Sequence, residues 1–258
     1  MLETAVEAAR RAGQLIAEQY PTARDVSHKG YRDLVTETDI AAEETILELI
    51  HQRFPDHAIL SEEAAGGDIG AGYTWVIDPL DGTSNYAHRL PIFSVSIALL
   101  EQGDPIIGVV YDPMREHLFA GQRGSGATLN DEPLQVSTIV ELEHSLVGFD
   151  WARGVEARKQ VLSKLERVAP LCHTVRSMGS AALGLTYVAA GWLEGYFHLA
   201  LHPWDAAAAV LLVAEAGGRY TTYDGGAYDI SLPRCAATNG LIHEDLLDAL
   251  LDALQGSD

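Results

Sequence analysis

Apolar residues recur at helical spacing in two stretches near the start of the chain. The first stripe consists of Val6, Ala9, Ala12 or Gly13, Ile16 and Tyr20. It predicts an amphipathic helix over residues 2–20, closed by Pro21. The second stripe consists of Ile40, Leu47, Ile50 and Phe54. It predicts a helix over residues 39–54, which Thr38 or Asp39 can cap.

The hydrophobic period changes to that of β-strands from Tyr73 onward. Short apolar runs, separated by Gly, Pro and Asp, predict consecutive strands of one sheet. These runs are TWVID, FSVSIALLE, IIGVVYD and EHLFAGQ, and a later run, GYFHLALH, is also strand-like. Helical spacing returns at residues 155–168, 180–191, 205–216 and 242–254. This order predicts an α/β (α+β) fold of layered helices and sheets.

The chain is long enough for one large unit or for two closely joined lobes. We expect residues 1–258 to form a single unit, with lobes at approximately 1–140 and 141–258 and a junction near 138–145. The stretch GQRGSGATLNDEPL has the glycines of a phosphate loop. A turn and a strand follow it rather than a helix, so we expect a hairpin there.

Charge and cysteine content narrow the classes of function. Seventeen basic against thirty-seven acidic side chains give a net charge of −20, which disfavours nucleic acid and anionic membranes as partners. Cys172 and Cys235 form no CxxC pair, so we expect buried thiols in a reducing compartment. The first twenty residues carry scattered charges and lack the apolar run of a signal peptide or membrane span. We therefore expect a cytoplasmic protein.

The segment WVIDPLDGTSNY contains two carboxylates at the end of an apolar strand. Asp78 and Asp81 are separated only by Pro79 and Leu80. If both were buried and ionised they would repel each other, so a shared proton, solvent or a metal ion must offset the repulsion. Mg²⁺ suits the arrangement because it prefers carboxylate and carbonyl oxygens. The alternatives are an ordinary Asp-rich turn, which stays open, and a calcium loop of the EF-hand kind, which the spacing excludes.

Residues that can open a helix follow these carboxylates. Gly82, Thr83 and Ser84 would then present free backbone N–H groups, which bind anions such as phosphate. The sequence therefore predicts metal and phosphate sites side by side.

Other acidic residues are ambiguous when each is considered alone. Glu62 and Glu63 follow the short apolar run AIL and are equally typical of a solvated loop. Asp205 precedes the alanine-rich helix and, like Asp39, is typical of a helix cap.

Four blocks of the sequence, taken in order, resemble the inositol monophosphatase family of metal-dependent phosphatases. They are DLVTETD, SEEAAG, WVIDPLDGTSNYAHRLPIFSVSIAL and PWDAAAAVLLVAEAGG, and GATLNDEPLQVS and RSMGSAALGLTYVAAG support them. The resemblance covers nearly the whole chain. It implies a layered αβαβα sandwich, usually a homodimer and lithium-sensitive, with the site between the two halves.

The resemblance also implies metal ligands and a reaction. Glu62, Asp78 and the carbonyl of Leu80 match the ligands of a first magnesium, and Asp78, Asp81 and Asp205 match those of a second; a third ion, where present, would use Glu62. Lys29 lies near a family lysine that approaches the metal waters, although the loop here is one residue shorter.

The implied catalytic and substrate-binding residues lie around these ligands. Thr83, bonded to Asp39, would orient the proton of the attacking water, and Glu62 would share in activating that water. The implied substrate-binding residues are Asp81, Gly82, Thr83, Ser84, Ser180, Ala181, His198 and Asp205.

One position departs from inositol-specific members of the family. Where they carry a glutamate for substrate hydroxyls, this chain has His198. Period-two alternation places His198, Ala200 and His202 on one face, so His198 is expected to point where that glutamate would. It can hydrogen-bond a hydroxyl, indicate another substrate, or be a satisfied buried side chain.

The leading hypothesis is a Mg²⁺-dependent phosphatase of a small phosphate monoester, such as inositol monophosphate or a related sugar or polyol phosphate. Fructose 1,6-bisphosphate, histidinol phosphate and 3'-phosphoadenosine 5'-phosphate are the alternative substrates. The last of these requires extra basic or aromatic contacts, which the sequence does not reveal. A catalytically idle homologue that binds a metal or a partner is the non-enzymatic alternative.

Overall fold

The first two helices of the chain pack against each other. The computed structural model describes residues 1–21, 26–30, 33–63 and 69–251. The two helices are α1, Leu2–Gln19, and α2, Glu37–Arg53. The predicted caps of α2, Thr38 or Asp39, were wrong by two or three residues, because Thr36 is the N-cap. The carboxylate of Asp39 lies in the first turn and accepts a hydrogen bond from the Thr36 N–H at 2.9 Å.

A seven-stranded sheet has the order β3-β4-β5-β6-β7-β8-β9. Its strands are β3, Ala58–Ser61; β4, Tyr73–Asp81; β5, Ser94–Glu101; β6, Asp104–Asp112; β7, His117–Gln122; β8, Ala127–Leu129; and β9, Glu132–Pro133. Neighbouring strands from β4 onward are antiparallel. The last three strands confirm the hairpin interpretation of the glycine-rich stretch.

Both faces of this sheet are buried, so apolar residues of its central strands point to either side. Trp75 and Ile77 pack toward α1 and α2, whereas the intervening Val76 belongs to the core on the other side. That second core contains α5, Ala181–Ala189, and α6, Pro203–Glu215. The alternation along β4 thus joins two cores through one sheet.

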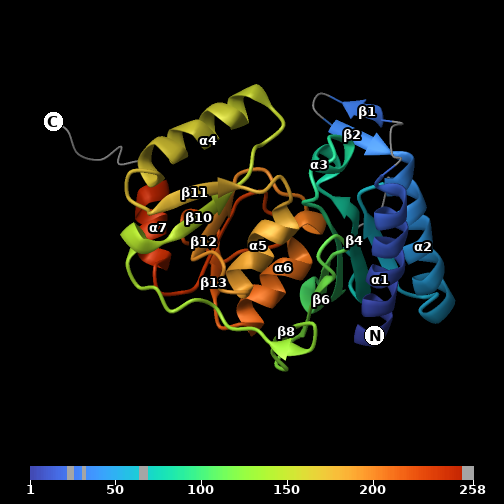
Figure 1. The fold of residues 1–258 in the computed structure, drawn as a ribbon. Helices are drawn as coiled ribbons and strands as arrows, with labels where there is room; N and C mark the ends of the chain where they lie inside the picture. Colours follow the sequence, from blue (N-terminus) through green and yellow to red (C-terminus); the bar gives the residue numbers. More distant parts are fainter. Residues whose placement is uncertain (22–25, 31–32, 64–68, 252–258) are drawn as a thin grey trace.

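A five-stranded sheet on the far side of α5 and α6 completes the layers (Figure 1). Its order is β11-β10-β12-β14-β13, with β10 at Leu146–Phe149, β11 at Thr174–Ser177, β12 at Gly195–His198, β13 at Arg219–Thr221 and β14 at Cys235–Thr238. Helices α4, Val155–Val168, and α7, His243–Leu250, cover its outer face. The predicted αβαβα sandwich is therefore confirmed, and the division into lobes stays a prediction.

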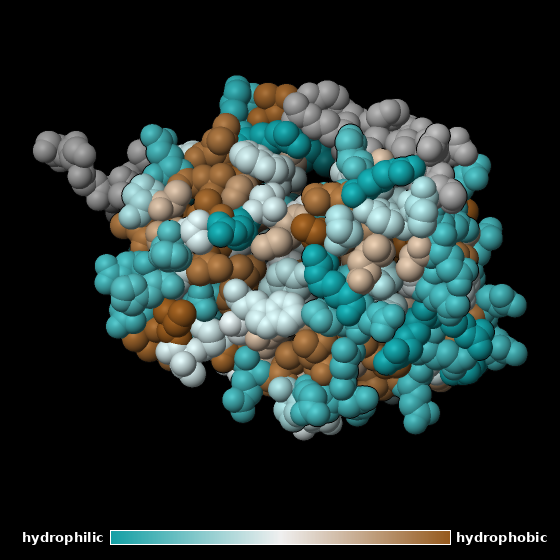
Figure 2. Space-filling view, in the orientation of Figure 1, coloured by the Kyte–Doolittle hydropathy of each residue, from teal (hydrophilic) through white to brown (hydrophobic). Residues whose placement is uncertain are grey.

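The remaining described elements are short. An antiparallel hairpin of β1, Val26–Gly30, and β2, Asp33–Thr36, precedes α2, and α3, Thr83–Ala87, follows β4. A 3₁₀ turn at Leu142–His144 precedes β10. Polar side chains cover the surface over α1 and α2, at the right of Figure 2. Of the helices in the described residues, none is both long and apolar enough to cross a membrane.

Several predicted boundaries moved. The strand-like run GYFHLALH is a strand only as far as His198, and α6 begins at Pro203 rather than at Asp205. Proline is favoured in the first helical turn because its missing N–H has no partner there. The prediction for the last helix extends to residues 252–254, which lie outside the described residues.

Helix α6 lies close against the seven-stranded sheet because the residues at their contact, glycine on β6 and alanine on α6, are small. A Cβ added to Gly108 of β6 would lie 2.5 Å from the backbone oxygen of Ala208. Ala206, Ala207 and Ala209 in the same turns are also fully buried. This contact sets the distance between Asp205, at the start of α6, and the carboxylates that follow β4.

We predict that Gly108→Ala destabilises the protein by about 2 kcal/mol, because the helix backbone must move away from the sheet. Chemical denaturation of the variant measures this loss. Gly72→Ala is the matched control, since a Cβ there meets nothing within 4 Å. Equal stability of the two variants would contradict the close packing of α6 on β6.

Candidate metal and phosphate site

The two carboxylates at the end of β4 lie on the same side because the strand is irregular there. Asp78 pairs with Ser96 of β5 and Asp81 with Ser94, and the register shifts between these pairs. In a regular strand, residues three apart point to opposite faces. The bulge around Pro79 and Leu80 removes that alternation and directs both carboxylates into one cavity.

Asp205 completes a group of three carboxylates from the first turn of α6. Ligand oxygens of Asp78, Asp81 and Asp205 all lie within 4.8 Å of one another. The backbone N–H of His202 donates to Asp205 Oδ2 at 2.7 Å, so this carboxylate also serves the helix N-terminus. The capping interpretation of Asp205 and its metal-ligand interpretation are therefore compatible.

Burial makes the ionised form of these carboxylates costly. It raises the pKa of Asp78 and of Asp205 well above the usual range, and repulsion from Glu62 and Asp81 adds to both shifts. Burial is also the main reason why the pKa of Asp81 rises from 3.8 to about 7. A cation within the group would offset both burial and repulsion, and an all-oxygen donor set suits Mg²⁺. The residues therefore fit the metal that the resemblance implies.

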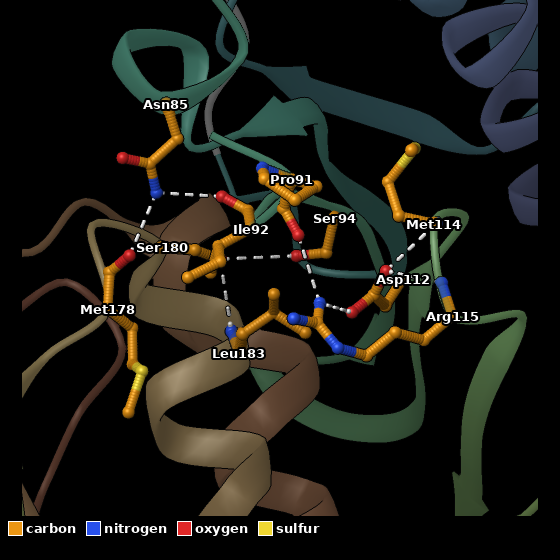
Figure 3. Close-up of polar contacts among 10 residues, drawn as sticks. All are labelled: Asn85, Pro91, Ile92, Ser94, Asp112, Met114, Arg115, Met178, Ser180 and Leu183. Atoms are coloured by element: carbon orange, nitrogen blue, oxygen red, sulfur yellow. Dashed lines mark hydrogen bonds and ion pairs between the residues drawn. The ribbon is translucent and has the colours of Figure 1, made fainter. Parts of the chain in front are cut away.

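Asp81 is held by the N-terminal turn of α5. The hydroxyl of Ser180 donates to Asp81 Oδ2, and the Ala182 N–H donates to the same oxygen at 2.8 Å. Ser180 is itself the N-cap of α5, bonded to the Leu183 N–H at 3.4 Å and lying 3.5 Å from the hydroxyl of Ser94 (Figure 3). Ser180 is 1% exposed, so its hydrogen bond holds Asp81 from within the protein. Ala181, its neighbour, lines the cavity.

The turn that precedes α5 is tied to α3. Asn85 donates through Nδ2 to the carbonyl oxygens of Ile92 and Met178, at 2.7 and 2.8 Å (Figure 3). Gly82, the N-cap of α3, has φ of 101°, and an added Cβ would lie 3.0–3.2 Å from Ile92, Phe93 and Gly179. Glycine is required here both by conformation and by space.

Thr83 and Asp39 are in direct contact, as predicted. Thr83 Oγ1 lies 3.0 Å from Asp39 Oδ1 and 3.0 Å from the carbonyl oxygen of Leu80. Burial raises the pKa of Asp39, and hydrogen bonds from Thr36 and Thr83 oppose that shift. The bonds join α2, β4 and α3 beneath the cavity.

A cavity of about 410 Å³ opens over these groups, a size typical of small-molecule sites. Of the predicted site residues, all but Ser180 and Asp39 line it: Glu62, Asp78, Leu80, Asp81, Gly82, Thr83, Ser84, Ala181, His198 and Asp205. Glu63 is not among the lining residues, and the side chain of Lys29 lies outside the described residues.

His198 enters the cavity as a neutral ring. Its Nδ1 accepts the Ala200 N–H at 3.0 Å, so the proton of the neutral imidazole is on Nε2. Burial lowers the pKa of His198 to about 4, and His202 contributes to the shift. Although the strand ends at His198, Ala200 and His202 also line the cavity, as the alternation predicted.

The cavity is also lined by residues that were not predicted, and the polar and aromatic ones among them are Asp150, Trp151, Arg153 and Arg158. Asp150 accepts hydrogen bonds from the Ser177 hydroxyl and the Gly179 N–H, both at 2.7 Å, and from the Tyr196 hydroxyl at 3.0 Å. It thereby fixes the turn that carries Ser180. Burial raises the pKa of Asp150 to about 6. These residues belong to no recognisable motif, and Arg158 is seven residues from Trp151 in the chain, so the sequence did not indicate that they share a site.

The fold and the carboxylate group define a metal-dependent phosphatase architecture. The profile of the inositol monophosphatase family matches residues 1–256, and the chain belongs to that family. It is 45% identical to the inositol-1-monophosphatase of Synechocystis, over 96% of this chain and 88% of that protein. It is 43% identical to the Nus factor SuhB of Escherichia coli, over 99% and 98%.

Solved structures agree with these sequence matches. The extragenic suppressor protein suhB of Bartonella henselae superimposes with a TM-score of 0.92 at 36% identity, covering 98% of each chain. The inositol monophosphatase of Anabaena gives a TM-score of 0.85 at 40% identity, covering 96% of this chain and 94% of that one. The predicted family is therefore confirmed.

The raised carboxylate pKa values predict an unusual pH dependence of stability without metal. A carboxyl whose pKa is higher in the folded protein binds protons more tightly there, so stability falls as pH rises from about 4 to the folded pKa of about 7 at Asp81. We expect a lower Tm at about pH 8 than at about pH 5.5 in a chelator, and a larger Mg²⁺-induced rise in Tm at the higher pH.

Thermal unfolding at both pH values, with and without Mg²⁺, measures these differences. Asp81→Asn removes one of the titrating groups and should flatten the metal-free dependence. A metal-free Tm that increases from the lower to the higher pH would show that the carboxylates are not strained by burial.

Proposed function

We propose that this protein is a Mg²⁺-dependent phosphatase of a small phosphate monoester, with inositol monophosphate or a related sugar or polyol phosphate as the substrate. The observation that carries the proposal is the group formed by the buried Asp78 and Asp81 and the partly buried Asp205, all of which line one cavity. Fructose 1,6-bisphosphate, histidinol phosphate and 3'-phosphoadenosine 5'-phosphate are the alternative substrates.

In this proposal the acidic residues share two magnesium ions. Glu62, Asp78 and the Leu80 carbonyl would hold one, and Asp78, Asp81 and Asp205 would hold the other; a third ion would use Glu62. When bound, Mg²⁺ supplies positive charge that lowers the pKa of water and offsets charge on the phosphate oxygens. The proximity of Glu62 to the group is supported by its effect on the pKa of Asp78.

Thr83 orients the proton of the attacking water. A hydroxyl has one hydrogen and two lone pairs, so a Thr83 hydroxyl that donates to Asp39 offers its oxygen as an acceptor. Water then attacks phosphorus in line with the leaving oxygen, and no phosphorylated residue is required. The raised pKa of Asp39 shows that its charge is costly, and the bonds from Thr36 and Thr83 stabilise the ionised form.

The other lining residues bind the phosphate and the leaving group. Gly82, Thr83 and Ser84 line the cavity at the first turn of α3, where backbone N–H groups can contact phosphate oxygens. His198 offers its Nε2–H, so it donates to a substrate oxygen where a glutamate would accept from a hydroxyl. This exchange of acceptor for donor favours substrates with an acceptor at that position.

A second candidate function is a partner-binding role. The relatives that favour it are named Nus factor SuhB and are 42–43% identical to this chain. A chain with no selection for turnover is expected to lose metal ligands. Glu62, Asp78, Asp81, Thr83 and Asp205 are all present, which favours the enzyme. The homodimer and a cytoplasmic location remain predictions.

We predict Mg²⁺-dependent phosphate release from a panel of inositol 1-phosphate, fructose 1,6-bisphosphate, histidinol phosphate, 3'-phosphoadenosine 5'-phosphate and glycerol 2-phosphate. Asp78→Asn should lower kcat at least ~1,000-fold because it weakens both proposed metal positions. Circular dichroism and Tm of the variant control for folding. A folded Asp78→Asn protein that retains most of the activity would refute the two-metal assignment.

Lithium should inhibit turnover by replacing the second magnesium. A titration of Li⁺ at fixed Mg²⁺ measures the effect, with Na⁺ and K⁺ as controls for ionic strength. Rates that stay constant across the lithium series would contradict the proposed position of the second ion.

A further inference from the structure

The side of the cavity contributed by residues 151–158 carries a charge opposite to that of the metal-ligand side. We call Trp151, Arg153 and Arg158 the Trp151 wall. These residues follow β10 and continue into α4, whereas Asp78, Asp81 and Asp205 come from β4 and α6. The wall and the carboxylates line the same cavity.

Arg153 reaches the edge of the carboxylate group. Its Nη2 lies 3.4 Å from Glu62 Oε1, and its side chain is 50% exposed. Its charge also lowers the pKa of Asp205, in opposition to the larger effects of burial and of Asp81. The Arg153 guanidinium therefore interacts electrostatically with both Glu62 and Asp205.

Arg158 is held in place on the aromatic ring beside it. Its Nε donates to the carbonyl oxygen of Ala152 at 2.8 Å, and its guanidinium carbon lies 5.7 Å from the centre of the Trp151 ring. A guanidinium has five N–H donors, and this hydrogen bond uses one. Trp151 is 38% exposed, and Phe149 contacts it edge-on, with the ring centres 5.4 Å apart. A fixed cation and a partly exposed ring thus lie side by side.

Hydrolysis of a polyol monophosphate has no evident use for this wall. In the proposed function, the transferred phosphate would be bound at the carboxylate side of the cavity, near Thr83 and the turn at Gly82, and a polyol leaving group would offer only hydroxyls. Arginine side chains are instead suited to phosphates and carboxylates, which they bind through paired N–H groups. The chain as a whole has a net charge of −20, so two arginines beside an acidic site have the opposite sign to the net charge of the protein.

We propose that the Trp151 wall is a subsite for a second anionic group carried by the leaving group of the substrate. This inference rests on the proposed phosphatase function and narrows its substrate class to phosphate monoesters that bear another phosphate or a carboxylate. A sugar bisphosphate would use the two arginines alone. A nucleoside 3',5'-bisphosphate would use them and also place its base on the Trp151 ring.

The test compares substrates with one and two anionic groups in wild type, Arg153→Gln and Arg158→Gln. The substrates are inositol 1-phosphate, fructose 1,6-bisphosphate and 3'-phosphoadenosine 5'-phosphate. We expect the ratio of kcat/KM for a bisphosphate to that for inositol 1-phosphate to fall about tenfold in each variant, mainly through KM. Arg158→Lys should recover part of this ratio, because it restores charge without the paired donors.

Lys159→Gln is the matched control, since it removes the same charge from the same helix. Lys159 pairs with Glu156 at 2.8 Å and is not a lining residue. Trp151→Ala separates the two sources of the second anion: a selective loss with the nucleotide identifies a base on the ring, and an equal loss with both bisphosphates identifies the arginines as the main contact. Both results support the subsite.

Two outcomes overturn the inference. One is an equal loss of kcat/KM with all three substrates, which places the arginines on the transferred phosphate or in a purely structural role. The other is an unchanged ratio in both arginine variants. Calorimetric binding of fructose 1,6-bisphosphate and inositol 1-phosphate with Ca²⁺ in place of Mg²⁺ applies the same comparison without turnover, so failure of the proposed function is distinguished from failure of the subsite.

Discussion

The carboxylates of the buried Asp78 and Asp81 and the partly buried Asp205 lie within 4.8 Å of one another, so they cannot all be ionised at low cost unless a positive charge accompanies them. The bulge at Pro79, the close packing of α6 on β6 and the turn before α5 all bring Asp78, Asp81 and Asp205 into this costly arrangement. Folding free energy from the two apolar cores maintains it. We therefore expect the site to lower the stability of the metal-free protein and to favour a bound cation.

The sandwich suits this task because the cavity has walls from several layers. One wall comes from the seven-stranded sheet and α3, another from the helices between the sheets, and a third from the loop that joins β10 to α4. Each layer contributes a different chemistry: carboxylates from the first two, and an aromatic ring with two arginines from the third. In the proposed function, metal binding and recognition of the leaving group would use separate parts of this cavity.

Much of this arrangement was predictable from the sequence because the residues involved are close in the chain or resemble family blocks. Asp78 and Asp81 follow one apolar run, and the alanine-rich run after Asp205 predicted a helix. The Trp151 wall was not predictable, because its approach to Glu62 depends on how two sheets are placed around α5 and α6. The caps of α2 and α6 were misjudged because Asp39 and Asp205 act from within the first turn, by bonding back to Thr36 and His202.

The central claim is that the buried carboxylates hold divalent cations. Anomalous diffraction from crystals soaked in Mn²⁺, which shares the preference of Mg²⁺ for oxygen ligands, tests it most directly. We predict strong anomalous peaks at ligand distance from Asp78, Asp81 and Asp205, with Glu62 completing the coordination of one ion. Well-ordered carboxylates with no anomalous peak among them would contradict it.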